Sequence, residues 1–79
     1  MFATAQTKRE KTIQKLFAQA QEQVEDSLYN EALLTYKQIR KIADDNSTAF
    51  AKATYNMGYT NMLLNDEVSA REIFLLTWD

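Results

Sequence analysis

The sequence predicts an all-α fold of four antiparallel helices, arranged as two stacked helix-turn-helix hairpins. The chain of 79 residues has no proline and a single glycine, so little in it interrupts a helix. Apolar residues recur at helical spacing in four separate stretches. Short polar clusters separate these stretches, and connections of this length make successive helices antiparallel neighbours.

The first helix is expected from Thr7 to about Asp26, because one apolar stripe runs through this segment. Its members are Ile13, Leu16, Phe17, Ala20 and Val24. The basic residues in the first turns of this segment are Lys8, Arg9, Lys11 and Lys15. They are interrupted by Glu10 and favour a solvated helix face over a phosphate-binding patch.

The second helix is expected to follow Asp26-Ser27, with Asn30 as its N-cap. Its stripe consists of Ala32, Leu33, Tyr36, Ile39 and Ala43. The cluster Asp44-Asp45-Asn46-Ser47 then offers caps for a third helix. It lacks the glycine and distal glutamate of a calcium loop, so capping is the preferred interpretation.

The third helix is predicted around Phe50, Ala53, Met57 and Leu64, and the fourth around Val68, Ile73, Phe74 and Thr77. The pair Asn65-Asp66 is the expected break between them. Asparagine adopts the left-handed backbone conformation more readily than most residues, so Asn65 is the expected turning point.

The two predicted hairpins share one internal pattern. Ala20 is followed by Ala32 twelve residues later and by Tyr36 four residues after that. Gly58 is followed at the same intervals by Ala70 and Phe74. Small residues let two helix backbones approach closely, and an aromatic ring one turn further fills the space between helices. The pattern therefore predicts two copies of one repeat unit.

With this spacing the sequence resembles the tetratricopeptide repeat (TPR) family. Tyr29-Asn30-Glu31-Ala32 is similar to the start of the family's second helix, and Tyr55-Asn56-Met57-Gly58-Tyr59 to the middle of its first helix. Departures include Leu16 and Thr54, which stand where the family often has tryptophan. The alternative is a generic four-helix bundle that matches the pattern by chance.

The resemblance covers Ile13 to Asp79 and divides the chain into three parts. Residues 1–12 form an N-terminal extension, 13–50 a first TPR-like repeat and 51–79 a second. Together the repeats would be a fragment of a longer α-solenoid.

The resemblance also implies a function, which is to bind a peptide or partner protein on a concave surface made by the first helix of each repeat. The partner-binding residues expected on this basis are Phe17, Gln21, Lys52, Tyr55, Asn56, Tyr59 and Met62. Only Asn56 matches the family's carboxylate clamp, so a clamp is not expected.

Composition argues against catalysis and against several partner classes. The chain has no cysteine or histidine, and therefore no thiolate or imidazole for catalysis or for metal binding. Its formal net charge of −2 disfavours nonspecific nucleic-acid binding. No apolar run approaches the ~20 residues of a membrane span. We therefore expect no enzyme activity, no cofactor and no metal.

The second functional hypothesis is a structural module that oligomerises or stacks through its apolar C-terminal helix. The residues expected in this contact are Phe74, Leu75, Leu76 and Trp78. Such a surface fits either a homo-oligomer or a cut through a longer protein. At the other end, Ala3-Thr4-Ala5 has the form of a signal-peptide cleavage site. Localisation thus stays open between the cytoplasm and, if this is a remnant, the periplasm or a secreted location.

Overall fold

A computed structural model describes the backbone of residues 6–77 and the side chains of residues 6–69 and 71–72. This part of the chain contains three helices and no strand: α1 (Lys8–Glu25), α2 (Tyr29–Ile42) and α3 (Thr48–Thr77). The helical content agrees with the sequence prediction, but the prediction of four helices in two stacked hairpins is wrong. One hairpin, α1–α2, is followed by one long helix.

The first helix begins with a capping box. The hydroxyl of Thr7 accepts a hydrogen bond from the backbone N–H of Glu10 at 3.1 Å, and the Glu10 carboxylate accepts one from the Thr7 N–H at 3.4 Å. Two of the N–H groups that a helix start leaves without partners are satisfied in this way.

The first helix ends in a tight turn at Ser27, which has a φ of 62°. The N–H of Ser27 donates to the carbonyl of Val24, and the N–H of Leu28 donates to the carbonyl of Gln23 at 2.7 Å. These two bonds form a Schellman motif. Because the motif closes the connection so early, α2 starts at Tyr29 with Leu28 as its N-cap residue. The predicted cap, Asn30, lies one residue inside the helix, so that prediction is wrong.

Ser47 caps the third helix, within the cluster where caps were expected. Its hydroxyl accepts from the N–H of Phe50 at 3.1 Å and donates to the carbonyl of Asp44 at 2.6 Å. From Thr48 the helix continues for 30 residues without a break.

The predicted turn at Asn65-Asp66 does not form, because both residues lie inside α3. Nothing at this point forces a break, and the Arg71 guanidinium lies 3.1 Å from the Glu67 carboxylate in a pair that favours continued helix. Gly58 and Ala70 therefore lie on one helix, about 18 Å apart along its axis. They do not form the predicted interhelical contact, so the second copy of the repeat is absent.

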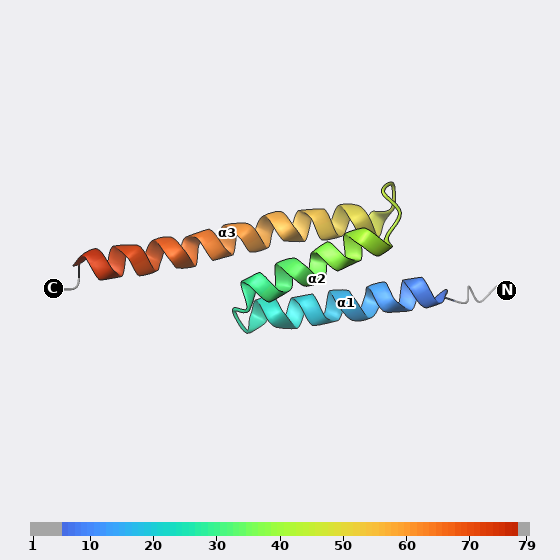
Figure 1. Cartoon of the computed structure of the whole chain (residues 1–79), viewed down its shortest axis with the longest axis horizontal. Coiled ribbons are helices and arrows are strands. Elements are labelled where there is room, and N and C mark those ends of the chain that lie inside the picture. The colour runs from blue at the N-terminus through green and yellow to red at the C-terminus, as the bar shows by residue number, and fades with distance from the viewer. Residues whose placement is uncertain (1–5, 78–79) are drawn as a thin grey trace.

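The three helices pack as neighbours in sequence (Figure 1). The middle helix, α2, contacts both α1 and α3, whereas α1 and α3 touch each other only sparsely. The buried cluster that joins them consists of Ala20, Ala32, Tyr36, Ile39 and Ala53. Ala20 and Ala32 are both fully buried in it, so the first copy of the predicted small-residue contact is present.

Two polar contacts hold α2 against its neighbours. On one side, the hydroxyl of Thr35 donates to the side-chain carbonyl of Gln23 on α1 at 2.7 Å. On the other side, the guanidinium of Arg40 lies 4.7 Å from the centre of the Phe50 ring on α3. A guanidinium over an aromatic face is attracted to the ring electrons, so both contacts fix the position of α2.

The third helix extends past the hairpin (Figure 1). Its 30 residues span about 45 Å, against about 21 Å for the 14 residues of α2 that it packs along. The molecule is accordingly a rod of 66 × 22 × 20 Å. Of the residues expected to self-associate, Trp78 and the side chains of Phe74, Leu75 and Leu76 lie outside the described part of the chain. Residues 1–5, with the proposed cleavage site, also lie outside it.

Candidate functional site: a groove between α1 and α3

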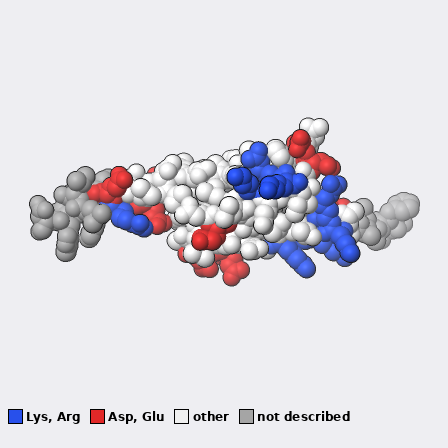
Figure 2. Space-filling view, in the orientation of Figure 1, with Lys and Arg blue, Asp and Glu red and all other residues white. Residues whose placement is uncertain are grey.

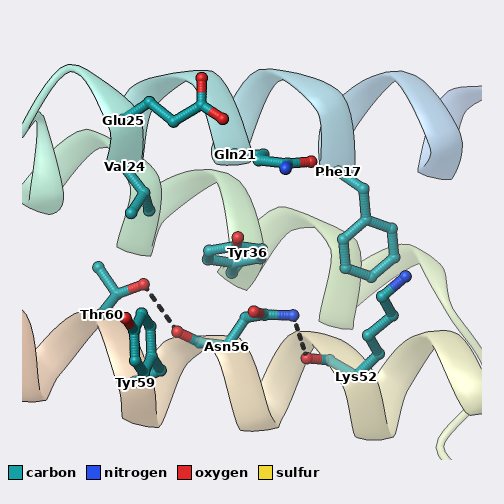
Figure 3. A pocket seen from close by; sticks show the side chains of 9 residues that line it. All are labelled: Phe17, Gln21, Val24, Glu25, Tyr36, Lys52, Asn56, Tyr59 and Thr60. Carbon is teal, nitrogen blue, oxygen red and sulfur yellow. Dashed lines mark hydrogen bonds between the residues drawn. The ribbon is translucent and has the colours of Figure 1, made fainter.

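A groove of about 480 Å³ lies between α1 and α3, with α2 beneath it (Figure 3). It forms because α2 separates the two outer helices, which run in the same direction. The residues that line it are Phe17, Gln21, Val24, Glu25, Tyr36, Lys52, Asn56, Tyr59 and Thr60.

Tyr36 forms the floor of the groove. It is the groove residue contributed by α2, and only 5% of its surface is exposed. Its ring meets that of Phe17 at a centroid distance of 6.1 Å and an interplanar angle of 57°, a tilted geometry that aromatic pairs favour. Burial raises the pKa of the Tyr36 phenol above its ordinary value of 10.0, because the anion would lose its hydration.

One end of the groove carries a positive charge. The ammonium of Lys52 lies 5.1 Å from the centre of the Phe17 ring, which links α3 directly to α1. The carboxylate of Glu25 lies at the opposite end of the groove (Figure 3). The groove therefore has opposite charges at its two ends.

Amide groups occupy the walls between these ends. Gln21 projects from α1, and Asn56 projects from α3 toward it (Figure 3). The amide of Asn56 donates to the carbonyl of Lys52 at 2.8 Å, and the hydroxyl of Thr60 donates to the carbonyl of Asn56 at 2.7 Å. A primary amide has two N–H donors and a carbonyl acceptor, so this one bond leaves Asn56 able to bond a ligand.

Five of the seven residues expected on a binding surface lie together in this groove. They are Phe17, Gln21, Lys52, Asn56 and Tyr59. The other two, Tyr55 and Met62, are 74% and 53% exposed and border a shallower depression on the outer face of α3. Neighbouring helix positions point about 100° apart, so Tyr55 faces away from the groove that Asn56 lines. Tyr59 borders both surfaces.

Val24, which the resemblance also places on the concave side of the first helix, is a further groove residue. Sequence reasoning missed the remaining three, Glu25, Tyr36 and Thr60. Helical spacing was the available signal for two of them, since Glu25 follows Gln21 by four residues and Thr60 follows Asn56 by four. Tyr36 was assigned to the core alone. Its edge reaches the groove because the small residues Ala20 and Ala53 are its partners in the buried cluster.

The described side chains, residues 6–69 and 71–72, include no group of three acidic residues placed to hold a metal ion. Within the same part of the chain, no helix combines the length and apolar character that crossing a membrane requires.

No protein-family model matches this chain, and no curated protein or solved structure is significantly similar to it. The resemblance to TPR proteins therefore stays a prediction from the sequence.

Proposed function

We propose that this chain is a protein-interaction module, without catalysis, that binds a peptide or a partner helix in the groove between α1 and α3. The observation that carries the proposal is the convergence of Phe17, Gln21, Lys52, Asn56 and Tyr59 on one groove. These residues come from two helices that are separate in sequence, and a third helix supplies the floor beneath them.

The chemistry of the groove suits an amphipathic segment. Phe17, Val24 and Tyr59 offer apolar contact for one inserted side chain, and the amides of Gln21 and Asn56 offer hydrogen bonds to a backbone. A partner with an acidic group near Lys52 and a basic group near Glu25 would complement the charges at the two ends.

The first experiment selects ligands from a displayed library of random peptides on the folded protein. The affinity of a selected peptide is then measured by calorimetry for the wild type and for Phe17→Ala. We expect a loss of about 1–4 kcal/mol if Phe17 is a central anchor. Tyr55→Ala is the control, because it removes an exposed aromatic ring on the outer face of α3.

A second variant guards against a folding defect in Phe17→Ala. Lys52→Glu changes an exposed side chain, and it should reverse the preference of the groove for acidic over basic peptide residues at that end. Circular dichroism checks that both variants remain helical. The proposal fails if peptides bind Phe17→Ala and Lys52→Glu as tightly as they bind the wild type.

The alternative function is a structural module that self-associates through the C-terminal part of α3. The feature that favours it is the continuation of α3 beyond the α1–α2 hairpin. The side chains expected to form that contact, Phe74, Leu75 and Leu76, lie outside the described part of the chain.

A further inference from the structure

The outer face of α3, turned away from α2, is apolar and exposed. Thr54, Tyr55, Gly58, Tyr59 and Met62 border a shallow depression on it. Tyr59 is 47% exposed, and Tyr55 and Met62 are exposed still further. Tyr55, Gly58 and Met62 follow one another at intervals of three and four residues, so they share one side of the helix. We call these five residues the outer face.

Gly58 has no explanation within a single molecule. It is the only glycine of the chain and lies in the interior of α3, where glycine destabilises a helix by roughly 0.5–1 kcal/mol relative to alanine. A Cβ atom built at this position would meet nothing within 4 Å. What a glycine permits here is the close approach of another helix from outside.

The outer face is complementary to a second copy of itself in the antiparallel direction. In this arrangement two antiparallel α3 helices cross at the point between Gly58 and Tyr59 of each copy. Gly58 of each copy then lies level with Tyr59 of the other along the axis. Because Gly58 and Tyr59 point about 100° apart, the two glycines approach each other on one side of the contact and the two Tyr59 rings meet on the other side. Tyr55 lies opposite Met62, because each is three residues from the central pair.

Charges flanking the outer face agree with the same alignment. Lys52 precedes Gly58 by six residues, and Asp66 follows Tyr59 by seven. In the antiparallel register, Lys52 of one copy and Asp66 of the other are therefore offset by only about 1.5 Å along the helix axis. Successive residues of a helix point about 100° apart, so Lys52 and Asp66 both lie on the same side of the outer face as Tyr59. The two-fold symmetry of such a dimer produces the pair of Lys52 and Asp66 twice.

The distribution of charge along the whole rod also favours antiparallel packing of two copies (Figure 2). One end holds the start of α1, the end of α2 and the start of α3, as the contact between Arg9 and Asp44 at 3.5 Å shows. The basic residues at this end are Lys8, Arg9, Lys11, Lys15, Lys37, Arg40, Lys41 and Lys52. The acidic residues toward the other end are Glu22, Glu25, Asp26, Glu31, Asp66, Glu67 and Glu72. Glu10, Asp44 and Asp45 reduce the positive excess of the first end and Arg71 reduces the negative excess of the other, but neither sign is reversed. Antiparallel packing places unlike ends together, whereas parallel packing places like ends together.

We propose that a second copy of this chain docks antiparallel on the outer face of α3 and forms a two-fold symmetric dimer. In this register Thr48 of one copy falls opposite Ser69 of the other. The length of α3 that extends past its own hairpin thus lies along the start of the partner's α3. The contact is self-complementary and closes at two copies. The dimer contact is distinct from the peptide-binding groove, but it shares Tyr59 and Lys52 with it.

The main experiment is sedimentation equilibrium of the full chain and its variants. We expect the wild type to dimerise and Gly58→Leu to raise the dissociation constant at least tenfold. Leucine is a better helix former than glycine and the space outside Gly58 is open, so the variant monomer should keep its helicity and melt no lower than the wild-type monomer. Leu34→Ser is the control, because Leu34 is an exposed apolar residue on α2, away from the outer face.

Charge reversal tests the direction of packing. Lys52→Glu and Asp66→Lys should each weaken the dimer, and the double variant should recover the wild-type dissociation constant. Added NaCl should weaken the wild-type dimer, because exposed charge pairs are screened. No recovery in the double variant would overturn the antiparallel register.

Disulfide cross-linking tests the register directly, since the natural chain has no cysteine. Mixing the Tyr55→Cys chain with the Met62→Cys chain should give a cross-linked heterodimer under mild oxidation, whereas neither chain alone should cross-link efficiently.

A strict monomer at millimolar concentration would overturn the proposal. So would a dimer that Leu76→Glu abolishes and Gly58→Leu leaves intact, because it would use the C-terminal turns instead. Peptide binding lost in Phe17→Ala with the dimer intact would separate the two proposals.

Discussion

Tyr36 is shared by the buried cluster and the groove. Its ring packs with Phe17 and between helices, while its edge forms the groove floor. Burial disfavours the charged form of this phenol because the anion would lose its hydration, and this raises the pKa of Tyr36. One residue thereby couples the protonation of the chain to its folding.

The expected consequence is a loss of stability at high pH. Below about pH 10 the phenol is protonated in both the folded and the unfolded chain, and the stability contributed by neutral Tyr36 is fully present. As the pH rises, the unfolded chain loses its proton first, so the free energy of unfolding falls until the pH passes the raised pKa of the folded state. Urea unfolding from pH 9 to 11.5 measures this fall.

Tyr36→Phe should flatten that pH dependence, because the variant has no phenol to ionise at this site. Tyr55→Phe removes an exposed phenol instead and should keep the wild-type fall. Equal slopes for Tyr36→Phe and wild type would show that Tyr36 is not the residue responsible.

Among the secondary-structure elements, α1 and α2 are held together by small residues. Ala20 and Ala32 have no exposed surface, and a larger side chain at either position would push the two helices apart. Ala20→Leu and Ala32→Leu should therefore each lower the free energy of unfolding by about 1–3 kcal/mol, measured by urea denaturation.

Ala18→Leu provides the matched control for this overpacking. Ala18 lies on the same helix as Ala20 but is exposed, so leucine there should change stability by no more than about 0.5 kcal/mol. If all three variants unfolded alike, the helices would not be in close contact at Ala20 and Ala32.

The sequence could predict this hairpin because its signals are local. Thr7 and Glu10 define a helix start, and the interval from Ala20 to Ala32 defines a close contact across one tight turn. Asn65-Asp66 carries no comparable information. Polar residues are tolerated on the exposed side of a helix, so a turn forms there only if a fourth helix gains enough by packing back.

The candidate site shows a similar division. Gln21, Lys52 and Asn56 were expected on a binding surface from the resemblance to TPR proteins, and they lie together in the groove. Placing Tyr55 required knowing which side of α3 faces α2, since one residue turns the helix by about 100°. The predicted apolar stripe already included Ala53 and Met57, which pack toward α2. Tyr55 was assigned to the binding surface by the resemblance to TPR proteins and not by this stripe.

At the scale of the whole molecule, α2 lies between α1 and α3, and each helix packs on its neighbour in sequence. Most contacts of the described core join helices that are adjacent in sequence, so few of them wait for the closure of a long loop. Chains dominated by such local contacts fold in microseconds to milliseconds, because the entropy lost before each contact forms is small. We expect relaxation after a temperature jump to fall in this range. Seconds-long folding of the monomer would contradict this expectation.

Either pair of neighbouring helices, α1–α2 or α2–α3, is able to form first, so the chain has two routes to the same native state.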